Sequence, residues 1–202
     1  MKNRSDRTDQ ILKLAHKSVV ISTGEMRSQG IHHEYLRQLS KEGKLIRIGR
    51  GLYSLPDADI TIHHGLAQAA KAVPKAVVCL LSALRFHAIG TQTPHEVWVA
   101  IERRAGHPRA KYPKLRIMRF SGRSLTEGVE EHSIEGVVVK IYNPAKTVAD
   151  CFKYRNKIGL DVAIEALREV IRERKATADD LWRYAEICRI TKIMRPYMEA
   201  IV

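Results

Sequence analysis

The sequence predicts an α+β fold, in which an N-terminal winged helix-turn-helix is followed by a larger mixed α+β domain with several C-terminal helices. The strongest observation is the stretch Ile31–Pro56, where a short amphipathic helix runs directly into two strands joined by a glycine-flanked turn. Further along, segments rich in β-branched and aromatic residues are followed by apolar stripes at helical spacing. The 202 residues are enough for two small domains. We therefore expect a winged-helix domain at residues 1–58 and an α+β domain at residues 59–202.

Local signals predict the first two helices. Apolar residues at helical spacing indicate a helix over Thr8–His16. Ser22 followed three residues later by Glu25 has the form of a capping box, which is typical of a helix start. We therefore expect a second helix that begins there and ends near Gln29, before a glycine.

The third helix and the wing follow directly. A helix is predicted over His32–Glu42, and Gly43 closes it as a left-handed cap residue. Lys44–Ile48 and Leu52–Leu55 alternate in apolar character about the turn Gly49-Arg50-Gly51, which predicts a β-hairpin. Three helices and a hairpin complete a small domain.

The remaining elements are predicted from composition and periodicity. We expect helices over His63–Val73 and Leu80–Ala88, strands over Val97–Ile101, Leu115–Phe120 and Val137–Tyr142, and a helix over Ala145–Lys153 that begins at Pro144. Two apolar stripes, starting at Leu160 and Ile190, predict helices that face the core. Pro196 interrupts the second stripe, so we expect two short helices there, with the proline at the start of the second.

Basic residues are concentrated in two blocks. Residues 1–57 carry 11 Lys and Arg against 6 Asp and Glu, and residues 95–125 carry 8 against 2, within a formal net charge of +13. Residues 126–202 carry 13 of each. A basic surface attracts polyanions because its binding to phosphates releases condensed counterions, which makes a nucleic acid the expected partner. A solvated basic surface without a specific ligand is the alternative that composition leaves open.

The cysteines and the apolar runs indicate the compartment. Cys79, Cys151 and Cys188 are odd in number and far apart, which argues against a disulfide framework or a zinc ribbon and fits a reducing environment. The longest apolar run, Ala76–Leu84, is much shorter than the roughly 20 residues that a membrane span requires. We therefore expect a cytoplasmic protein that does not bind membranes.

The exposed face of the third helix suits the recognition of DNA. With Leu36 and Leu39 on the buried side, five polar side chains fall on the opposite arc: His33, Glu34, Arg37, Gln38 and Lys41. Arginine pairs bidentately with guanine, glutamine with adenine, and lysine contacts phosphate, when such a helix lies in the major groove. A winged helix that serves as a protein-interaction module remains the alternative.

The wing and the second helix add candidate backbone contacts. Arg50, at the hairpin tip, can reach a phosphate or enter the minor groove, and Arg47 on the first wing strand is a weaker candidate. Ser22 and Thr23 stand where the N–H groups of the second helix could hold another phosphate.

The ordered motifs of the chain resemble those of AbiEi-type antitoxins. In the N-terminal half, the similar segments are S-T-x-E-M-R from Ser22, L-R-Q-L from Leu36 and G-K-L-I-R-I-G-R-G-L-Y-S-L-P from Gly43. In the second half, they are L-L-S-A-L-R-F-H-A-I-G at Leu80–Gly90, V-W-V-A-I at Val97–Ile101 and Y-N-P-A-K-T-V-A-D at Tyr142–Asp150. The resemblance extends over most of the chain.

This resemblance implies a two-domain antitoxin of a type IV toxin–antitoxin pair. Its N-terminal domain would bind inverted repeats in double-stranded DNA upstream of its own operon and repress transcription. Its C-terminal domain would be required to neutralise a nucleotidyltransferase-like toxin, without the need for a stable complex. The alternative is a winged-helix transcription factor whose C-terminal half is an unrelated interaction domain.

A second basic cluster follows the strand predicted at Val97–Ile101. Additional nucleic-acid contacts are expected from Arg103, Arg104, Arg109 and Lys111, and the wider cluster also contains Lys114, Arg116, Arg119 and Arg123. If this loop lies beside the wing it extends the contact with DNA, which is the interpretation we favour. An RNA contact is the alternative.

No motif of an enzyme is present. The sequence contains no G-x-S-x-G, no phosphate-binding G-x-x-x-x-G-K-[ST] and no H-E-x-x-H, so we expect no catalytic residues, no metal and no cofactor. A nuclease would require clustered carboxylates, and only convergence of Glu96, Glu102 and Asp150 in space could supply them. His63 and His64 are adjacent on a predicted helix and point about 100° apart, which does not suit joint metal binding.

Overall fold

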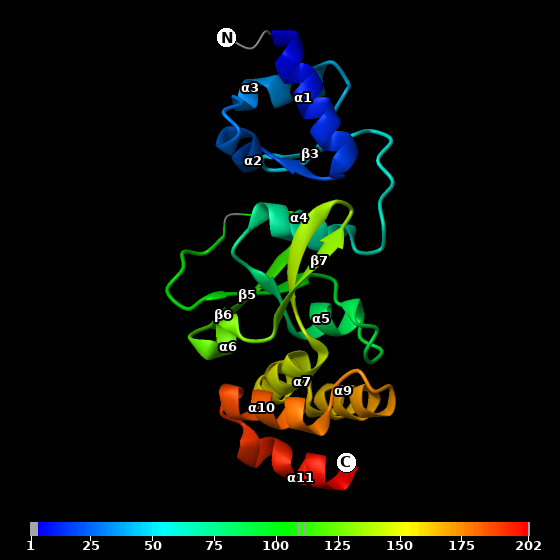
Figure 1. Ribbon diagram of the computed structural model, residues 1–202, viewed down its shortest axis with the longest axis vertical. Coiled ribbons are helices and arrows are strands. Elements are labelled where there is room, and N and C mark those ends of the chain that lie inside the picture. The colour runs from blue at the N-terminus through cyan, green and yellow to red at the C-terminus, as the bar shows by residue number, and fades with distance from the viewer. Residues whose placement is uncertain (1–3, 109, 111, 202) are drawn as a thin grey trace. The chain divides into compact units, whose positions relative to one another are not determined.

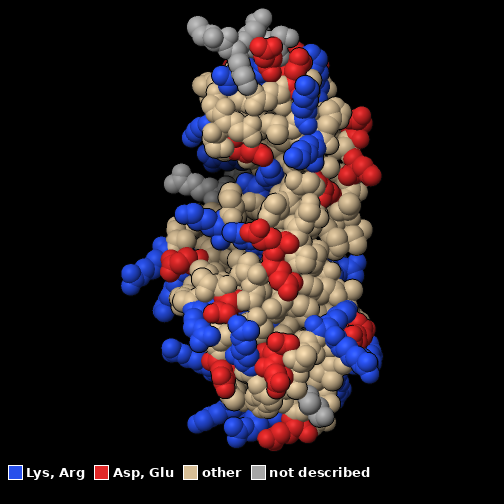
Figure 2. Space-filling view, in the orientation of Figure 1, with Lys and Arg blue, Asp and Glu red and all other residues tan. Residues whose placement is uncertain are grey.

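The computed structural model describes residues 4–108, 110 and 112–201, and it is a mixed α+β structure as predicted (Figure 1). The chain divides into two compact units. The first contains residues up to Lys75 together with His107–Leu115 and His132–Val139, and the second contains Ala76–Gly106, Arg116–Glu131 and the residues from Lys140 onward. This division does not coincide with the expected boundary at residue 58. Lys and Arg side chains are visible on the surface of both units (Figure 2).

The first unit has the element order of a winged helix, followed by one further helix. Its elements are α1 (Arg4–Lys17), β1 (Ile21–Ser22), α2 (Thr23–Ser28), α3 (His33–Lys41), β2 (Ile46–Gly49), β3 (Leu52–Ser54) and α4 (His64–Ala72). The predicted helices and hairpin all form, within a few residues at their ends. The short strand β1 was not predicted, because two residues are too few to show alternation.

Strand β3 lies in the middle of a three-stranded antiparallel sheet of order β1-β3-β2. Ser22 is opposite Leu52 on one side of β3, and Gly49 is opposite Leu52 on the other. The register shifts between Arg47 and Gly49, which marks a bulge just before the turn. The sheet therefore joins the wing to the start of α2 in one hydrogen-bonded layer.

A compact apolar core holds the three helices on this sheet. Its buried members are Ile11, Ala15, Ile21, Met26, Ile31, Leu36, Leu39, Leu45 and Tyr53. Leu36 and Leu39 face this core as predicted, which leaves the opposite side of α3 in solvent.

The second unit is built on strands of a five-stranded sheet covered by helices. The elements that follow α4 are β4 (Val77–Val78), α5 (Leu80–Phe86), β5 (Val97–Glu102), β6 (Leu115–Phe120), α6 (Arg123–Thr126), β7 (Val129–Ile134), β8 (Val137–Tyr142), α7 (Pro144–Lys153), α8 (Arg155–Ile158), α9 (Leu160–Arg172), α10 (Ala178–Cys188) and α11 (Thr191–Ile201). The strand order is β6-β5-β4-β8-β7, with β4 antiparallel to β5 and parallel to β8. None of the helices in the described residues combines the length and apolar character needed to cross a bilayer.

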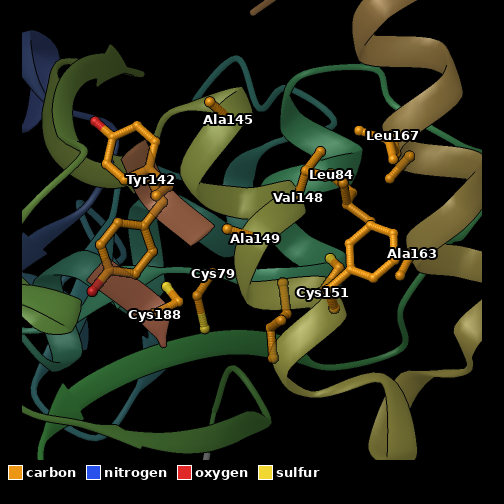
Figure 3. Close-up of a cluster of buried hydrophobic side chains, with 14 of the residues drawn as sticks. Cys79, Leu84, Tyr142, Ala145, Val148, Ala149, Cys151, Ala163, Leu167 and Cys188 are labelled. Carbon is orange, nitrogen blue, oxygen red and sulfur yellow. The ribbon is translucent and has the colours of Figure 1, made fainter. Parts of the chain in front are cut away.

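Helix α7 is the centre of the second core. Its residues Ala145, Val148, Ala149 and Cys151 lie between α5 and α9 on one side and Tyr142 and Cys188 on the other (Figure 3). Eight consecutive residues of α7, from Ala145 to Phe152, are buried, which is unusual for a helix of ordinary amphipathic pattern. The helix is therefore enclosed on every side.

Two of these buried residues carry opposite charges. Lys146 Nζ donates to Asp150 Oδ2 at 2.5 Å, and neither side chain is exposed to solvent. Lys146 Nζ also lies 4.1 Å from the ring centroid of Tyr142 and 5.0 Å from that of Phe120. Burial raises the pKa of Asp150, and the adjacent Lys146 ammonium partly offsets that rise.

The C-terminal helices depart from the prediction in two places. Residues 191–201 form one helix, α11, with Pro196 inside it, whereas two short helices were expected. The proline removes one backbone hydrogen bond, but burial of Met194 and Met198 on either side of it holds the helix together. Helix α10 was not predicted, although Thr177 and Asp180 form a complete capping box at its start.

In the first unit, a second buried charge fixes the tip of the β7–β8 hairpin. Glu135 Oε1 accepts hydrogen bonds from the Thr61 N–H at 2.6 Å and the Thr61 hydroxyl at 2.9 Å, and Glu135 Oε2 lies 2.7 Å from His64 Nδ1. Only 1% of the Glu135 side chain is exposed. Burial raises the pKa of this carboxyl, but the hydrogen bonds from His64 and Thr61 outweigh burial and leave the pKa below its usual value.

Removal of one partner of the buried ion pair in α7 should destabilise the folded protein. Asp150→Ala leaves the Lys146 ammonium without a partner, and we expect the free energy of unfolding to fall by about 3–5 kcal/mol. Lys146→Met combined with Asp150→Ala should lose less than Asp150→Ala alone, because no charge stays buried. Urea unfolding measures both, with Glu199→Ala on the exposed side of α11 as a control expected to stay within about 0.5 kcal/mol. A double variant as unstable as the single one would contradict this account.

The lowered pKa of Glu135 predicts a pH-dependent stability. Its ionised form is favoured in the folded state, so the contribution is fully present above the pKa of the unfolded chain, about 4.3, and is lost as pH falls through the lower folded value. Wild type should therefore exceed Glu135→Gln in stability at pH 6, and the difference should vanish toward pH 3. Unfolding curves across this range measure it, with the exposed Glu131→Gln as the control. A difference independent of pH would rule out ionisation as its cause.

Candidate nucleic-acid interface

The solvent side of α3 presents the side chains that the sequence predicted. His33, Arg37 and Lys41 are exposed, and Gln38 is half-buried. His32 caps the helix, with its Nδ1 accepting from the Glu34 N–H at 3.3 Å, and its ring lies 4.3 Å from the ring of His33. Because this cap fixes the start of α3, it orients the first turns of the helix. In helix-turn-helix proteins, these are the turns that approach base edges in the major groove.

Two polar side chains on this face have partners within the helix. Arg37 lies 3.6 Å from Glu34, and Gln38 donates to Glu42 at 2.9 Å. More than half of each side chain in the Arg37–Glu34 pair is exposed, so the pair is weak and can yield to a stronger anion. Arg37 can therefore exchange Glu34 for another anion at little cost.

The wing is short, and its tip is basic. Arg50 is exposed in the turn, and Arg47 is exposed on β2 with its Nε donating to the Gly49 carbonyl at 3.1 Å. Gly51 follows with φ of +72°, a conformation that favours glycine. The turn therefore holds Arg50 outward, whereas Arg47 is partly turned back onto the wing.

The start of α2 differs from the expectation that it would offer free N–H groups to a phosphate. The Thr23 N–H donates to the Gly51 carbonyl at 2.8 Å, and the Glu25 N–H donates to the Ser22 hydroxyl at 3.1 Å. The Glu25 carboxylate does not close the capping box but binds Lys71 Nζ at 2.6 Å. Ser22 and Thr23 thus fix the wing to α2, and a direct phosphate contact by either side chain stays a prediction.

The basic loop after β5 is divided between the two units. Arg103 and Arg104 are exposed in the second unit, while residues 107–115 belong to the first. The Tyr112 carbonyl lies 3.4 Å from where a Cβ would stand on Gly49, so Tyr112 itself packs beside the wing. Arg109 and Lys111 lie outside the described residues, and Lys114 is exposed on the same segment.

Comparison with known proteins identifies the N-terminal region. Residues 9–56 match the family described as "Transcriptional regulator, AbiEi antitoxin". The resemblance to AbiEi-type antitoxins is confirmed over this segment. The matched residues run from α1 to the end of the wing. The match therefore includes the eight candidate DNA contacts of α2, α3 and the wing, and it does not extend to α4 or to the second unit.

A solved structure shares the fold of this chain. No curated protein matches the chain. The crystal structure of the RV2827C protein from Mycobacterium tuberculosis is similar, with a TM-score of 0.54 and 12% sequence identity, over 89% of this chain and 71% of that one. At this identity the likeness shows the fold alone. The α+β architecture, with N-terminal helices before a larger α/β region, is therefore shared with a solved structure.

The AbiEi match is to a family of regulators and not to a family of enzymes. Among the described residues, no three His, Cys, Asp or Glu side chains gather as a metal site. The carboxylates considered for a nuclease are engaged elsewhere: Glu96 lies 3.8 Å from Arg116, Glu102 accepts from the Arg104 N–H, and Asp150 is buried against Lys146.

Sequence reasoning missed two long-range contacts that hold α2 in place, one to the wing and one to α4. The bond from Thr23 to Gly51 spans the second helix, the third helix and a strand, and the pair of Glu25 with Lys71 spans 46 residues. Both are long-range contacts of residue types that commonly lie in solvent. No local pattern could have indicated them.

The joint between wing and α2 can be tested at Gly51. A Cβ there would lie 2.6 Å from Thr23 Oγ1, whereas Gly43, also at φ +72°, has nothing within 4 Å. Gly43→Ala should cost about 1 kcal/mol of stability from backbone strain alone, and Gly51→Ala should cost about 1 kcal/mol more. Adding Thr23→Ala to Gly51→Ala should remove most of the excess, as measured by thermal or urea unfolding. Equal losses in Gly43→Ala and Gly51→Ala would mean that the contact does not constrain the wing.

Proposed function

We propose that this chain is a DNA-binding antitoxin that represses its own type IV toxin–antitoxin operon. In this proposal α3 enters the major groove, with His33, Arg37, Gln38 and Lys41 toward the DNA, while Arg50 and, more weakly, Arg47 approach the backbone or minor groove. The duplex would carry inverted repeats upstream of the operon, and the protein would act in the cytoplasm.

The main support for the proposal is that the residues matched by the AbiEi family include the exposed basic face of α3 and the basic wing tip. The family description names a transcriptional regulator, which supports a DNA-binding antitoxin. Within the same residues, the face of α3 opposite the buried Leu36 and Leu39 carries basic side chains beside a basic wing tip. A helix and wing with this charge provide both base-edge and phosphate contacts.

The proposed role of the second unit is to neutralise a nucleotidyltransferase-like toxin encoded alongside, without a stable complex. This part rests on the family and on no contact in the structure. Co-expression of the full chain with the product of a neighbouring nucleotidyltransferase gene should restore growth that the toxin alone arrests. The absence of such a neighbour, or of rescue, would leave a transcription factor with an unrelated second domain.

DNA binding is tested by titrating the full chain onto labelled DNA from upstream of its own gene, with an unrelated fragment as control, across a range of salt concentrations. We expect selective binding that weakens as salt rises. Equal binding to both fragments would indicate a basic surface without sequence specificity. The absence of binding would indicate that the N-terminal region is a protein-interaction module.

Two substitutions separate base recognition from phosphate contact. Arg37→Ala should cost about 1–3 kcal/mol of binding and relax discrimination at one base pair. Arg50→Ala should weaken all sequences evenly and reduce the slope of log affinity against log salt by about one. Lys13→Ala removes an exposed charge from α1 and serves as the control, with binding unchanged. The opposite pattern for Arg37 and Arg50 would exchange their roles.

A further inference from the structure

The second unit contains a hollow of about 720 Å³ that the proposed function does not use. It lies among the end of β6, the short helix α6 and the C-terminal ends of α7 and α10. Its walls carry five cationic side chains and one carboxylate: Arg103, Arg119, Arg123, Lys153, Arg189 and Glu186. Basic side chains gather over β6 and α6 on the molecular surface (Figure 2).

Two of the cations are held in place by the protein. Arg119 Nη1 donates to the carbonyls of Glu102, Arg103 and Ala105, which fixes both the guanidinium and the turn that carries Arg103. Lys153 Nζ donates to the Ser124 hydroxyl at 3.2 Å and is half-buried. Their positions are therefore set before any ligand arrives, which lowers the cost of ordering on binding.

The positive charge of the hollow is only partly neutralised. Glu127 lies 3.5 Å from Arg123 but is shared with Arg183 at 3.2 Å. Within the described part of the chain, neither Arg103 nor Arg189 forms an ion pair. Arg189 also has a left-handed backbone, with φ of +59°. Like charges gathered in one hollow repel each other, and a bound polyanion would relieve this repulsion.

An aromatic wall and an ordered floor complete the site. The rings of Phe120 and Tyr154 are stacked at 5.4 Å and 7°, and Lys153 Nζ lies 5.9 Å from the Tyr154 ring. Below them, the Ser124 hydroxyl donates to Cys188 Sγ at 3.7 Å, and the Cys188 thiol donates to Asp150 Oδ1 at 3.3 Å. Hydrogen bonds thus connect the base of the hollow to the buried ion pair of α7, and they oppose collapse of the hollow.

We propose that this hollow binds a nucleoside polyphosphate. The phosphate chain would lie among Arg103, Lys153 and Arg189, and the base would lie against Tyr154. The volume is that of a site for one small molecule, the cation excess suits a compact polyanion, and an aromatic face suits a nucleobase. The proposal is independent of DNA binding by the first unit.

Calorimetric titration of the full chain tests it, at physiological salt, with each of the four ribonucleoside triphosphates. Inorganic tripolyphosphate and adenosine are titrated in parallel. At least one nucleotide should bind more tightly than tripolyphosphate, and adenosine alone should bind weakly. Arg103→Ala with Arg189→Ala should weaken nucleotide binding tenfold or more. Both residues are exposed, so thermal unfolding of this variant should match wild type.

Two matched controls locate the effect. Lys192→Ala with Arg195→Ala removes the same charge from the exposed side of α11, and nucleotide binding should stay within twofold. Arg37→Ala with Arg50→Ala should leave nucleotide binding unchanged, because those residues belong to the first unit.

Four results would overturn the proposal. One is the absence of binding by any of the four nucleotides below about 1 mM. A second is equal weakening of nucleotide binding by the hollow variant and by the α11 control. A third is equal affinity for tripolyphosphate and nucleotides, which would indicate a site for phosphate alone. The fourth is displacement of the nucleotide by an unphosphorylated single-stranded oligonucleotide of higher affinity, which would indicate a groove for a nucleic-acid backbone.

Discussion

The buried ion pair between Lys146 and Asp150 organises the second unit. Two fully buried charges are tolerated only when they pair with each other and make further favourable contacts. Here the rings of Tyr142 and Phe120 contact the Lys146 ammonium, and the Cys188 thiol donates to the Asp150 carboxylate. Burial raises the pKa of Cys188 to about 11, so the thiol stays protonated and can donate to Asp150. The Tyr142 hydroxyl extends the network by donating to the Leu125 carbonyl at 2.7 Å. These contacts hold β8, α7 and α6 around one polar centre.

The same network explains why the segment Y-N-P-A-K-T-V-A-D has its composition. Asn143 caps α7 through its side chain, Pro144 occupies the first turn, and Lys146 and Asp150 lie one turn apart on the same face. Small residues between them allow close packing of α5, α9 and α10. The Asn143 cap and the Lys146–Asp150 pair of this segment therefore stabilise the packing of the second unit.

In the first unit the comparable constraint is the sheet that joins wing and α2. Because β3 pairs with both β1 and β2, the tip that carries Arg50 is positioned by the same hydrogen bonds that begin α2. A surface that reads DNA has to hold its helix and wing in a fixed geometry, since phosphate contacts set the register of base contacts. The match to AbiEi-type regulators covers this joint as a whole and ends with it.

From local signals alone, the sequence predicts the α+β class, the three N-terminal helices, the hairpin and the outward face of α3, because these depend on residue spacing, caps and glycine turns. It did not indicate β1, β4 or β7, whose pairing is decided by distant strands, and it divided α11 at Pro196, where packing of Met194 and Met198 overrides the lost hydrogen bond. The distribution of charge along the sequence indicates the basic loop. It does not indicate Lys153 or Arg189, because both lie in a stretch with no net charge. Only the tertiary structure brings them beside Arg103 and Arg119, because the closeness of side chains from four separate elements is a property of packing and leaves no periodic signal in the sequence.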